Sequence, residues 1–222
     1  MLQIDAFIFD LDGVIVDTAK YHYLAWKRLA NELGFDLTPE NNEKLKGVSR
    51  IESLNTILKW GKLKVDDSTK SELAEKKNAW YLEYISTMGR EEILPGVEEF
   101  INEARKQKIR LAVASASKNT LPILENLALK DYFEFIADGN MISKSKPDPE
   151  IFQLVAKTME LSPPGCVVFE DAASGISAAL AANMFAVGVG KPEHLTRANF
   201  VIADFEFLTY QEILEMITSY SD

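Results

Sequence analysis

The sequence has only one cysteine, Cys166, among its 222 residues. A single cysteine excludes an internal disulfide and a cysteine-rich metal site, and the chain begins without the basic segment and apolar run of a secretion signal. Both absences predict a protein of the reducing cytoplasm. Cys166 itself is expected to pack as a small apolar residue within a strand.

Positive charge is also scarce, with 24 Lys and Arg against 34 Asp and Glu and a formal net charge of −10. Nucleic acids and anionic membranes attract fields of basic residues, so this balance disfavours both as partners. The longest stretch without charge, residues 172–190, is interrupted by glycine, serine and asparagine. We expect it to form a helix, a turn and a buried strand rather than a membrane span.

Hydrophobic residues make up 47% of the chain, which is enough for a substantial core. Short apolar runs alternate with longer helical patterns, and strands that are apolar at nearly every position are typical of a parallel sheet covered by helices on both faces. The runs are residues 6–9, 109–114, 133–137, 166–169, 185–189 and 200–202. They predict an α/β fold with a Rossmann-like, mostly parallel sheet.

One interval, residues 17–92, lacks strand-like runs and shows helical periodicity instead. The helices predicted there begin after a cap at Asp17 or Thr18 and end at Gly34, then cover residues 44–59 and 72–85. We therefore expect an α/β catalytic core of residues 1–16 and 93–222, interrupted by a helical cap domain of residues 17–92.

Two aspartates, Asp10 and Asp12, follow the first predicted strand, at the sheet edge where open α/β folds bind ligands. Their spacing places both carboxylates on the same side of an extended segment, and Gly13 permits a tight turn after them. One carboxylate can act as a nucleophile while the other serves as general acid and base. The structural alternative is a turn with two solvated aspartates.

A second acidic pair, Glu170 and Asp171, follows the predicted strand at residues 166–169. Clustered carboxylates repel one another, so their approach to Asp10 requires a cation, and hard oxygen ligands suit Mg²⁺. The alternative is a pair of acids favoured at a helix N-terminus by the helix dipole.

Two further segments offer groups for an anion. Residues 115–119 read Ser-Ala-Ser-Lys-Asn and connect a predicted strand to a helix, where N–H groups can bind an oxyanion or the polar side chains can serve as plain caps. Lys146 precedes Pro147, which restricts its backbone to an extended form before a helix expected near Asp148. The Lys146 ammonium can balance a phosphoryl group, or it can simply be solvated.

The chemistry-bearing residues occur in the order Asp10, Asp12, Ser115, Lys146, Glu170, Asp171. This ordered set, each member at or near a predicted strand end, resembles the haloacid dehalogenase superfamily over the whole chain. The resemblance implies that Asp10 is phosphorylated, Asp12 is the acid and base, and Ser115 and Lys146 hold the transferring phosphoryl group. It also implies a catalytic Mg²⁺ held by Asp10, by the backbone carbonyl of Asp12, and by Glu170 and Asp171.

The predicted cap narrows the resemblance to the β-phosphoglucomutase branch of that superfamily. The matching stretches are residues 17–22 with Trp26, then 45–50, 76–78 and 115–119. The resemblance implies interconversion of β-glucose 1-phosphate and glucose 6-phosphate through β-glucose 1,6-bisphosphate, by a monomer whose only partner is a small sugar phosphate. The substrate-binding residues that it implies are Thr18, His22, Trp26, Leu45, Gly47, Arg50, Lys77, Ser115, Ala116, Ser117 and Asn119.

Within this set, the resemblance assigns Arg50, Ser117 and Asn119 to the distal phosphate. A mutase must hold one phosphate while the other reacts, and a guanidinium grips phosphate in bidentate fashion. A solvated helix residue is the alternative for Arg50.

The resemblance places Trp26, Leu45 and Lys77 around the sugar and makes Thr18, His22 and Lys77 couple cap closure to Asp12. His22 and Trp26 are four residues apart and share a helix face, so packing within the cap core is the alternative for both.

Two rival activities follow from the same residues. In a sugar-phosphate phosphatase, water instead of a sugar hydroxyl attacks phosphorylated Asp10, and every catalytic residue is shared with the mutase. A catalytically silent binding protein would keep the fold, but every expected catalytic position is filled, which disfavours it.

Two positions depart from the family pattern. Asn183 stands where relatives usually have glycine before a strand, and asparagine tolerates the left-handed backbone. Ala172 stands where relatives often have serine beside the metal ligands, which affects only the fine geometry of the metal site. His194, after a Lys-Pro pair, is expected on the surface.

Overall fold

The computed structural model describes residues 4–45 and 48–221, so Gly47 of the predicted substrate set lies outside the described residues. The chain divides into two compact units, one formed by residues 1–17 and 89–222 and the other by residues 18–88. The limits predicted from the sequence assign residue 17 and residues 89–92 to the helical part instead.

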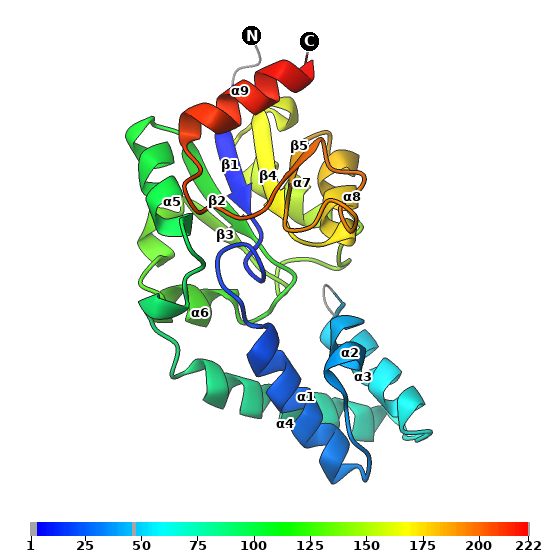
Figure 1. The fold of residues 1–222 in the computed structure, drawn as a ribbon. Coiled ribbons are helices and arrows are strands. Elements are labelled where there is room, and N and C mark those ends of the chain that lie inside the picture. Colours follow the sequence, from blue (N-terminus) through cyan, green and yellow to red (C-terminus); the bar gives the residue numbers. More distant parts are fainter. Residues whose placement is uncertain (1–3, 46–47, 222) are drawn as a thin grey trace. The chain divides into compact units, whose positions relative to one another are not determined.

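The larger unit contains one six-stranded sheet in which every neighbouring pair of strands is parallel, in the order β3-β2-β1-β4-β5-β6 (Figure 1). The strands are β1 (Ala6–Phe9), β2 (Arg110–Ala114), β3 (Phe135–Ala137), β4 (Cys166–Glu170), β5 (Phe185–Val189) and β6 (Phe200–Ile202). All six predicted strands are confirmed. β3 begins two residues later than predicted because a 3-10 turn, η2 (Lys130–Tyr132), ends at Phe133.

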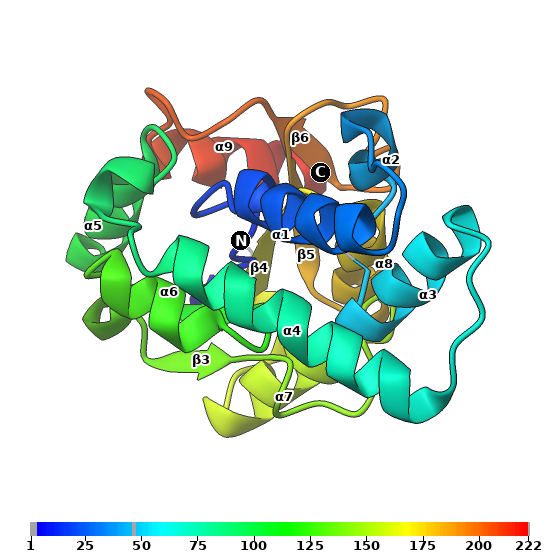
Figure 2. The ribbon, with the colours of Figure 1, turned by 90° about the horizontal axis from the view of Figure 1, so that it is seen from below.

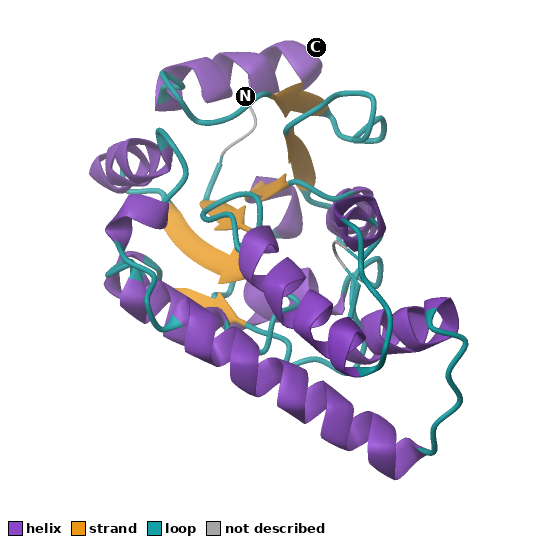
Figure 3. Ribbon diagram, turned by 60° about the horizontal axis from the view of Figure 1, so that its bottom comes forward, coloured by secondary structure: helices purple, strands orange, loops and turns teal. Residues whose placement is uncertain are grey.

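Helices cover both faces of this sheet, as the apolar strands predict (Figure 3). Successive side chains of β1 point to opposite faces. Ala6 and Ile8 enter a core shared with α7 (Glu150–Thr158) and α8 (Ala173–Ala181). Phe7 and Phe9 pack into an aromatic cluster on the other face, and the remaining members of that cluster are Phe100, Phe133, Phe169, Phe205 and Tyr210.

The remaining helical elements of this unit lie between successive strands, except for α9, which follows the last strand. They are η1 (Arg90–Glu92), α5 (Val97–Lys106), α6 (Thr120–Asn126), η3 (Pro163–Gly165) and α9 (Tyr210–Ser221). The helix predicted near Asp148 begins at Glu150, two residues later. Cys166 is fully buried within β4, His194 is exposed, and Asn183 adopts a left-handed backbone with φ 60°, as the sequence predicts.

The smaller unit is entirely helical in its described residues, and α1 and α4 pack side by side within it (Figure 2). Its helices are α1 (Ala19–Glu32), α2 (Pro39–Glu43), α3 (Arg50–Trp60) and α4 (Asp67–Ile85). The single helix predicted over residues 44–59 is therefore wrong in its first part. Lys44 ends α2, and α3 starts afresh because the Ser49 hydroxyl accepts the Glu52 N–H at its N-terminus.

The helix predicted from residue 72 begins five residues earlier, at Asp67. Asp66 supplies the missing signal, since its carboxylate accepts the Thr69 N–H at 2.8 Å. Within the described residues, no helix combines the length and the apolar character that crossing a bilayer requires.

The strand order places β1 between β2 and β4, so the chain leaves β1 toward one side of the sheet and later returns to fill the other. Ligands in open α/β folds bind at this reversal, outside the carboxyl ends of the strands. The register aligns Phe9 with Val113 on β2 and with Phe169 on β4. Residues that follow these three positions in the sequence are consequently brought together.

Candidate active site

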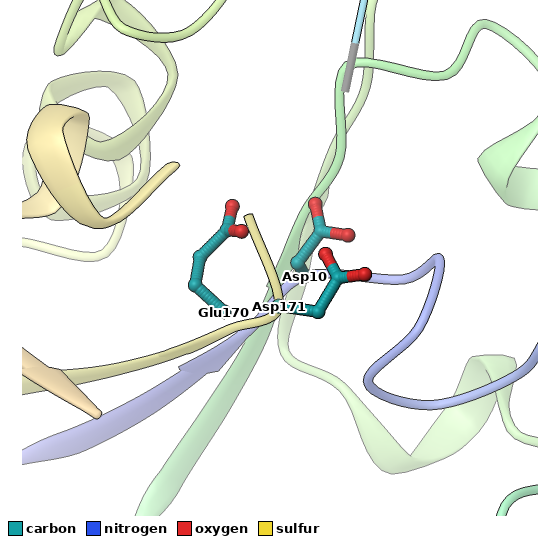
Figure 4. Close-up of side chains that lie close together, drawn as sticks. All are labelled: Asp10, Glu170 and Asp171. Atoms are coloured by element: carbon teal, nitrogen blue, oxygen red, sulfur yellow. The ribbon is translucent and has the colours of Figure 1, made fainter. Parts of the chain in front are cut away.

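Three carboxylates from β1 and β4 converge at this edge of the sheet. Asp10, Glu170 and Asp171 each offer one oxygen, and these oxygens lie within 4.8 Å of one another (Figure 4). The Asp10 N–H donates to the Phe169 carbonyl at 3.0 Å, which continues the β1–β4 pairing into the site. Carboxylate oxygens at this spacing suit a hard divalent cation.

Lys146 approaches the same carboxylates from the segment after β3. Its ammonium donates to Asp10 Oδ1 at 2.6 Å, to the Ala114 carbonyl at 2.9 Å and to Glu170 Oε1. Its side chain is only 6% exposed, and that of Glu170 only 1%. The alternative of a solvated lysine is therefore wrong, because the ammonium is enclosed and fully engaged.

Burial and mutual repulsion raise the pKa of the acids in this site. The pKa of Asp171 rises to about 8, first because burial disfavours the charged form and then because Glu170 and Asp10 repel it. Burial, with Asp10 adding to it, likewise raises the pKa of Glu170 even though Lys146 opposes the shift. Burial alone would lower the pKa of Lys146, but Asp10 and Glu170 outweigh it and raise that pKa. The single ammonium of Lys146 cannot balance the three carboxylates of Asp10, Glu170 and Asp171, so a bound cation can neutralise the remaining negative charge.

The chain makes room for the Glu170 carboxylate at the start of α8. A Cβ on Gly175 would lie 1.9 Å from the Glu170 Cδ, so only glycine fits against this side chain. The Ala172 N–H also donates to Glu170 Oε2 at 3.2 Å. The sequence analysis did not single out Gly175. Its position in the first turn of a helix that begins just after an acidic pair could have indicated that one of those acids packs against the helix backbone.

Asp12 lies on the tight turn that ends β1. Gly13 has φ 79°, in the left-handed region that glycine enters without strain, and its N–H donates to the Val16 carbonyl at 2.8 Å. The charge of Asp12 also contributes to raising the pKa of Asp171. The two aspartates of the first motif and the second acidic pair therefore form one electrostatic cluster.

The loop of residues 115–119 leaves β2 beside β1. Ser115 is buried, and its hydroxyl accepts the Ser117 N–H at 3.1 Å. The Ser117 hydroxyl in turn accepts the Asn119 N–H at 3.2 Å. These local bonds order the loop. The helix that follows, α6, has only seven residues, so an anion bound at this loop would depend on groups of the loop itself more than on a helix dipole.

A second polar cluster lies inside the helical unit. The Lys77 ammonium, with the residue 1% exposed, lies 2.8 Å from His22 Nδ1 and 4.6 Å from the ring centroids of Trp26 and Tyr81. His22 stacks on Tyr81 with ring centroids 4.1 Å apart. Burial, followed by the charges of Lys77 and Arg50, holds the pKa of His22 well below its ordinary value. The neutral form of His22 is consequently favoured, and its Nδ1 can accept a hydrogen bond from the Lys77 ammonium.

The other predicted residues of this unit differ in exposure. Thr18 and Leu45 are buried, whereas Arg50, at the first position of α3, is half-buried. Burial lowers the pKa of the Arg50 guanidinium. A fully solvated Arg50 is therefore excluded. Tyr81, which the sequence did not single out, joins this cluster because it is four residues after Lys77 on α4.

Comparison with known proteins identifies the family. The model for haloacid dehalogenase-like hydrolases matches residues 7–189. The chain belongs to this family. The matched range includes the helical unit and every motif residue from Asp10 to Asp171, so the family resemblance expected from the ordered motifs is confirmed.

Individual relatives match more of the chain than the family model does. A β-phosphoglucomutase of Bacillus subtilis is 42% identical over 95% of this chain and 94% of its own length. The crystal structure of a β-phosphoglucomutase from Clostridium difficile has a TM-score of 0.93 and 43% identity, with 99% of both chains covered. A phosphorylated carbohydrates phosphatase of Thermotoga maritima is 32% identical over 81% of this chain and 82% of its own length.

Proposed function

We propose that this protein is a Mg²⁺-dependent β-phosphoglucomutase, an isomerase that interconverts β-glucose 1-phosphate and glucose 6-phosphate through β-glucose 1,6-bisphosphate. The observation that carries the proposal is the 42% identity to a β-phosphoglucomutase over 95% of the chain, which includes the helical unit as well as the sheet. The cluster of Asp10, Lys146, Glu170 and Asp171 supplies the chemistry that such an enzyme needs.

In this proposal Asp10 is the nucleophile and exists as an aspartyl phosphate at the start of the cycle. A sugar hydroxyl attacks the phosphorus, the bond from phosphorus to the Asp10 oxygen breaks, and Asp12 takes the hydroxyl proton. The bisphosphate then reorients, Asp10 attacks its other phosphorus, and Asp12 returns the proton to the departing sugar oxygen. The protein is thereby restored, and one phosphate has moved from one end of the sugar to the other.

The site residues would share the charge of the transferring group. Mg²⁺ held by Asp10, Glu170, Asp171 and the backbone carbonyl of Asp12 would supply Lewis-acid stabilisation of the phosphoryl oxygens. Lys146 already lies 2.6 Å from Asp10, which supports its role as the protein's own cation at the reacting atom. Ser115 would hold the same phosphoryl group from the β2 loop.

The remaining substrate contacts are also part of the proposal. Arg50, Ser117 and Asn119 would hold the distal phosphate, and Gly47 and Ala116 belong to the same proposed substrate-binding set. Trp26, Leu45 and Lys77 would line the sugar, while Thr18 and His22 would couple movement of the helical unit to Asp12. We further propose that the enzyme acts as a cytoplasmic monomer.

A sugar-phosphate phosphatase is the second candidate, favoured by the 32% identity to the Thermotoga maritima phosphatase. The two activities differ in whether water or a sugar hydroxyl attacks phosphorylated Asp10. Each tenfold preference between these routes corresponds to only about 1.4 kcal/mol, so few contacts separate them.

The test supplies β-glucose 1-phosphate, Mg²⁺ and a trace of the 1,6-bisphosphate, and follows glucose 6-phosphate and free phosphate in parallel. The mutase predicts glucose 6-phosphate as the main product, no turnover after chelation of Mg²⁺, and no turnover by Asp10→Asn. Free phosphate as the main product would establish the phosphatase. Absence of both products, repeated across a panel of phosphate esters, would favour a silent binding protein.

A further inference from the structure

The segment that follows β3, residues 138–140, lies along the loop 115–119. The parallel pairing of β2 and β3 continues past the last strand residues, because the Ser115 N–H donates to the Ala137 carbonyl at 3.1 Å. Residues 138–140 read Asp-Gly-Asn, and neither the sequence motifs nor the proposed mechanism uses them.

Three consecutive carbonyls of the loop face this segment. The Ser117 carbonyl accepts the Gly139 N–H at 3.0 Å, and the Lys118 carbonyl accepts the Asn140 side-chain amide at 3.2 Å. The Ala116 carbonyl lies so near Gly139 that a Cβ there would be 2.2 Å from its oxygen. Thr120 Oγ1 donates to the Ser117 carbonyl as well, at 2.9 Å, which fixes that group from a second side.

This arrangement determines where the loop amides point. In a trans peptide the N–H of one residue is directed opposite to the carbonyl of the residue before it. Carbonyls of residues 116, 117 and 118 that face the segment 138–140 therefore turn the N–H groups of residues 117, 118 and 119 away from it. The same contacts turn the partial negative charges of these three carbonyl oxygens away from the side of the loop that would receive an anion.

Asp138 shapes the segment that makes these contacts. It is buried, 8% exposed, and its carboxylate accepts the Asn140 N–H at 2.8 Å and the Asn140 side-chain amide at 3.1 Å. The turn thus formed holds Asn140 with its amide directed to the Lys118 carbonyl and places the Gly139 backbone against the loop.

We propose that Asp138, Gly139 and Asn140 are positioning residues that hold the loop 115–119 in the conformation that receives the phosphoryl group. The inference rests on the proposed phosphoryl-transfer function. It adds residues outside both the acidic cluster and the proposed substrate-binding set, and these residues act through the backbone of the loop 115–119.

Gly139→Ala is the direct test, because the added methyl would lie 2.2 Å from the Ala116 oxygen and must displace that carbonyl by at least about 1 Å. Shifts of that size can lower activity about 100-fold. We expect kcat/KM for β-glucose 1-phosphate to fall about 10- to 100-fold, with a rise in KM and weaker binding of inorganic phosphate measured in Mg²⁺. Mg²⁺ binding, measured by calorimetry without phosphate, should be unchanged, since its acidic ligands follow β1 and β4.

A second pair of variants tests the same inference if Gly139→Ala folds poorly. Asp138→Ala removes both acceptors for Asn140 and should weaken phosphate binding, whereas Asp138→Asn keeps an acceptor for the Asn140 N–H and should restore most of it. Folded variants with wild-type phosphate affinity and KM would overturn the inference. Failure of the wild-type protein to bind phosphate in Mg²⁺ would instead contradict the proposed function and remove the basis of the inference with it.

Discussion

Lys146 is the residue whose environment is most consequential for the site. Its ammonium is the buried cation that lies between Asp10 and Glu170, and it also binds the Ala114 carbonyl at 2.9 Å. Removing one partner of a buried charge pair leaves the other uncompensated, which costs far more than losing a surface pair. The stability of the site and its chemistry therefore depend on the same side chain.

We predict that Lys146→Met lowers the free energy of unfolding by about 3–5 kcal/mol in metal-free solution, because two buried carboxylates lose their cation. Added Mg²⁺ should recover part of this loss and stabilise the variant more than the wild type. Urea unfolding with and without Mg²⁺ measures both effects. Lys144→Met, whose side chain is 70% exposed, is the matched control and should change stability little. Equal losses in the two variants would contradict the prediction.

The lowered pKa of His22 predicts that the free energy of unfolding depends on pH. Burial and the neighbouring cations lower its pKa in the folded protein, while the unfolded chain keeps an ordinary value near 6.5. The unfolded state therefore takes up the proton first as the pH falls. This contribution to stability is complete above about pH 6.5 and is lost progressively below it, at up to about 1.4 kcal/mol per pH unit.

The measurement is urea unfolding of the wild type and His22→Asn between pH 7.5 and 5. Asparagine retains an acceptor for Lys77 but does not titrate, so the variant should lose less stability on acidification than the wild type. The chain's other histidine provides the control, because His194 is exposed and His194→Asn should leave the pH slope unchanged. Parallel pH curves for His22→Asn and the wild type would show that His22 does not carry the effect.

At the scale of elements, capping bonds decide where two helices of the helical unit begin. Ser49 and Asp66 accept N–H groups at the starts of α3 and α4, and these bonds set the two boundaries that periodicity misplaced. α8 is different, because its N-cap residue is Ala172, which has the extended backbone of a cap but no side-chain acceptor. The N-terminus of α8 therefore lacks a side-chain cap bond.

We predict that Ala172→Ser stabilises the protein by about 0.5–2 kcal/mol, since its hydroxyl can accept an N–H of the first turn of α8. Urea unfolding in metal-free solution should show a higher midpoint with an unchanged slope. Ala173→Ser introduces the same hydroxyl one residue later, inside the helix, and should give no gain. A gain of equal size in both variants would exclude capping as the cause.

At the scale of the whole molecule, a net charge of −10 means that phosphate groups must be held by local cations. Arg50 belongs to the helical unit, whereas the acidic cluster belongs to the sheet unit. A mutase must hold one phosphate of its bisphosphate intermediate while the other reacts, whereas a phosphatase for small monoesters needs contacts to only one phosphate. The mutase reaction should therefore depend on a phosphate contact from the helical unit more strongly than hydrolysis of a small monoester does.

Arg50→Ala should lower kcat/KM for the bisphosphate-dependent mutase reaction about 10- to 100-fold, the effect of losing a hydrogen bond to a charged group. Hydrolysis of a small aryl phosphate by the same variant should change much less. Arg28→Ala, which removes a half-exposed guanidinium stacked on Trp80 in the same unit, is the control and should affect neither rate. Equal losses on both substrates would remove the distinction between mutase and phosphatase that rests on Arg50.

The sequence by itself determined the six strands, the helical interval and the family, because apolar periodicity and the order of motifs are local properties of the chain. It also pointed to Asp10, Lys146, Glu170 and Asp171, each near a strand end. The roles of these residues and of the predicted substrate-binding residues remain predictions for the experiments above.

Only the tertiary structure decided which of these groups meet. The parallel register of β1 with β2 and β4 brings Asp10, the Ala114 carbonyl and Glu170 together, and the pairing of β3 with β2 leads the chain back toward them. Lys146, on the segment after β3, then contacts Asp10, Glu170 and the Ala114 carbonyl across 136, 24 and 32 positions of sequence. The contacts of Gly175 with Glu170 and of residues 138–140 with the loop 115–119 arise in the same way. The physical reason is that strand periodicity repeats over a few residues, whereas register and close backbone approach depend on packing between segments distant in the chain.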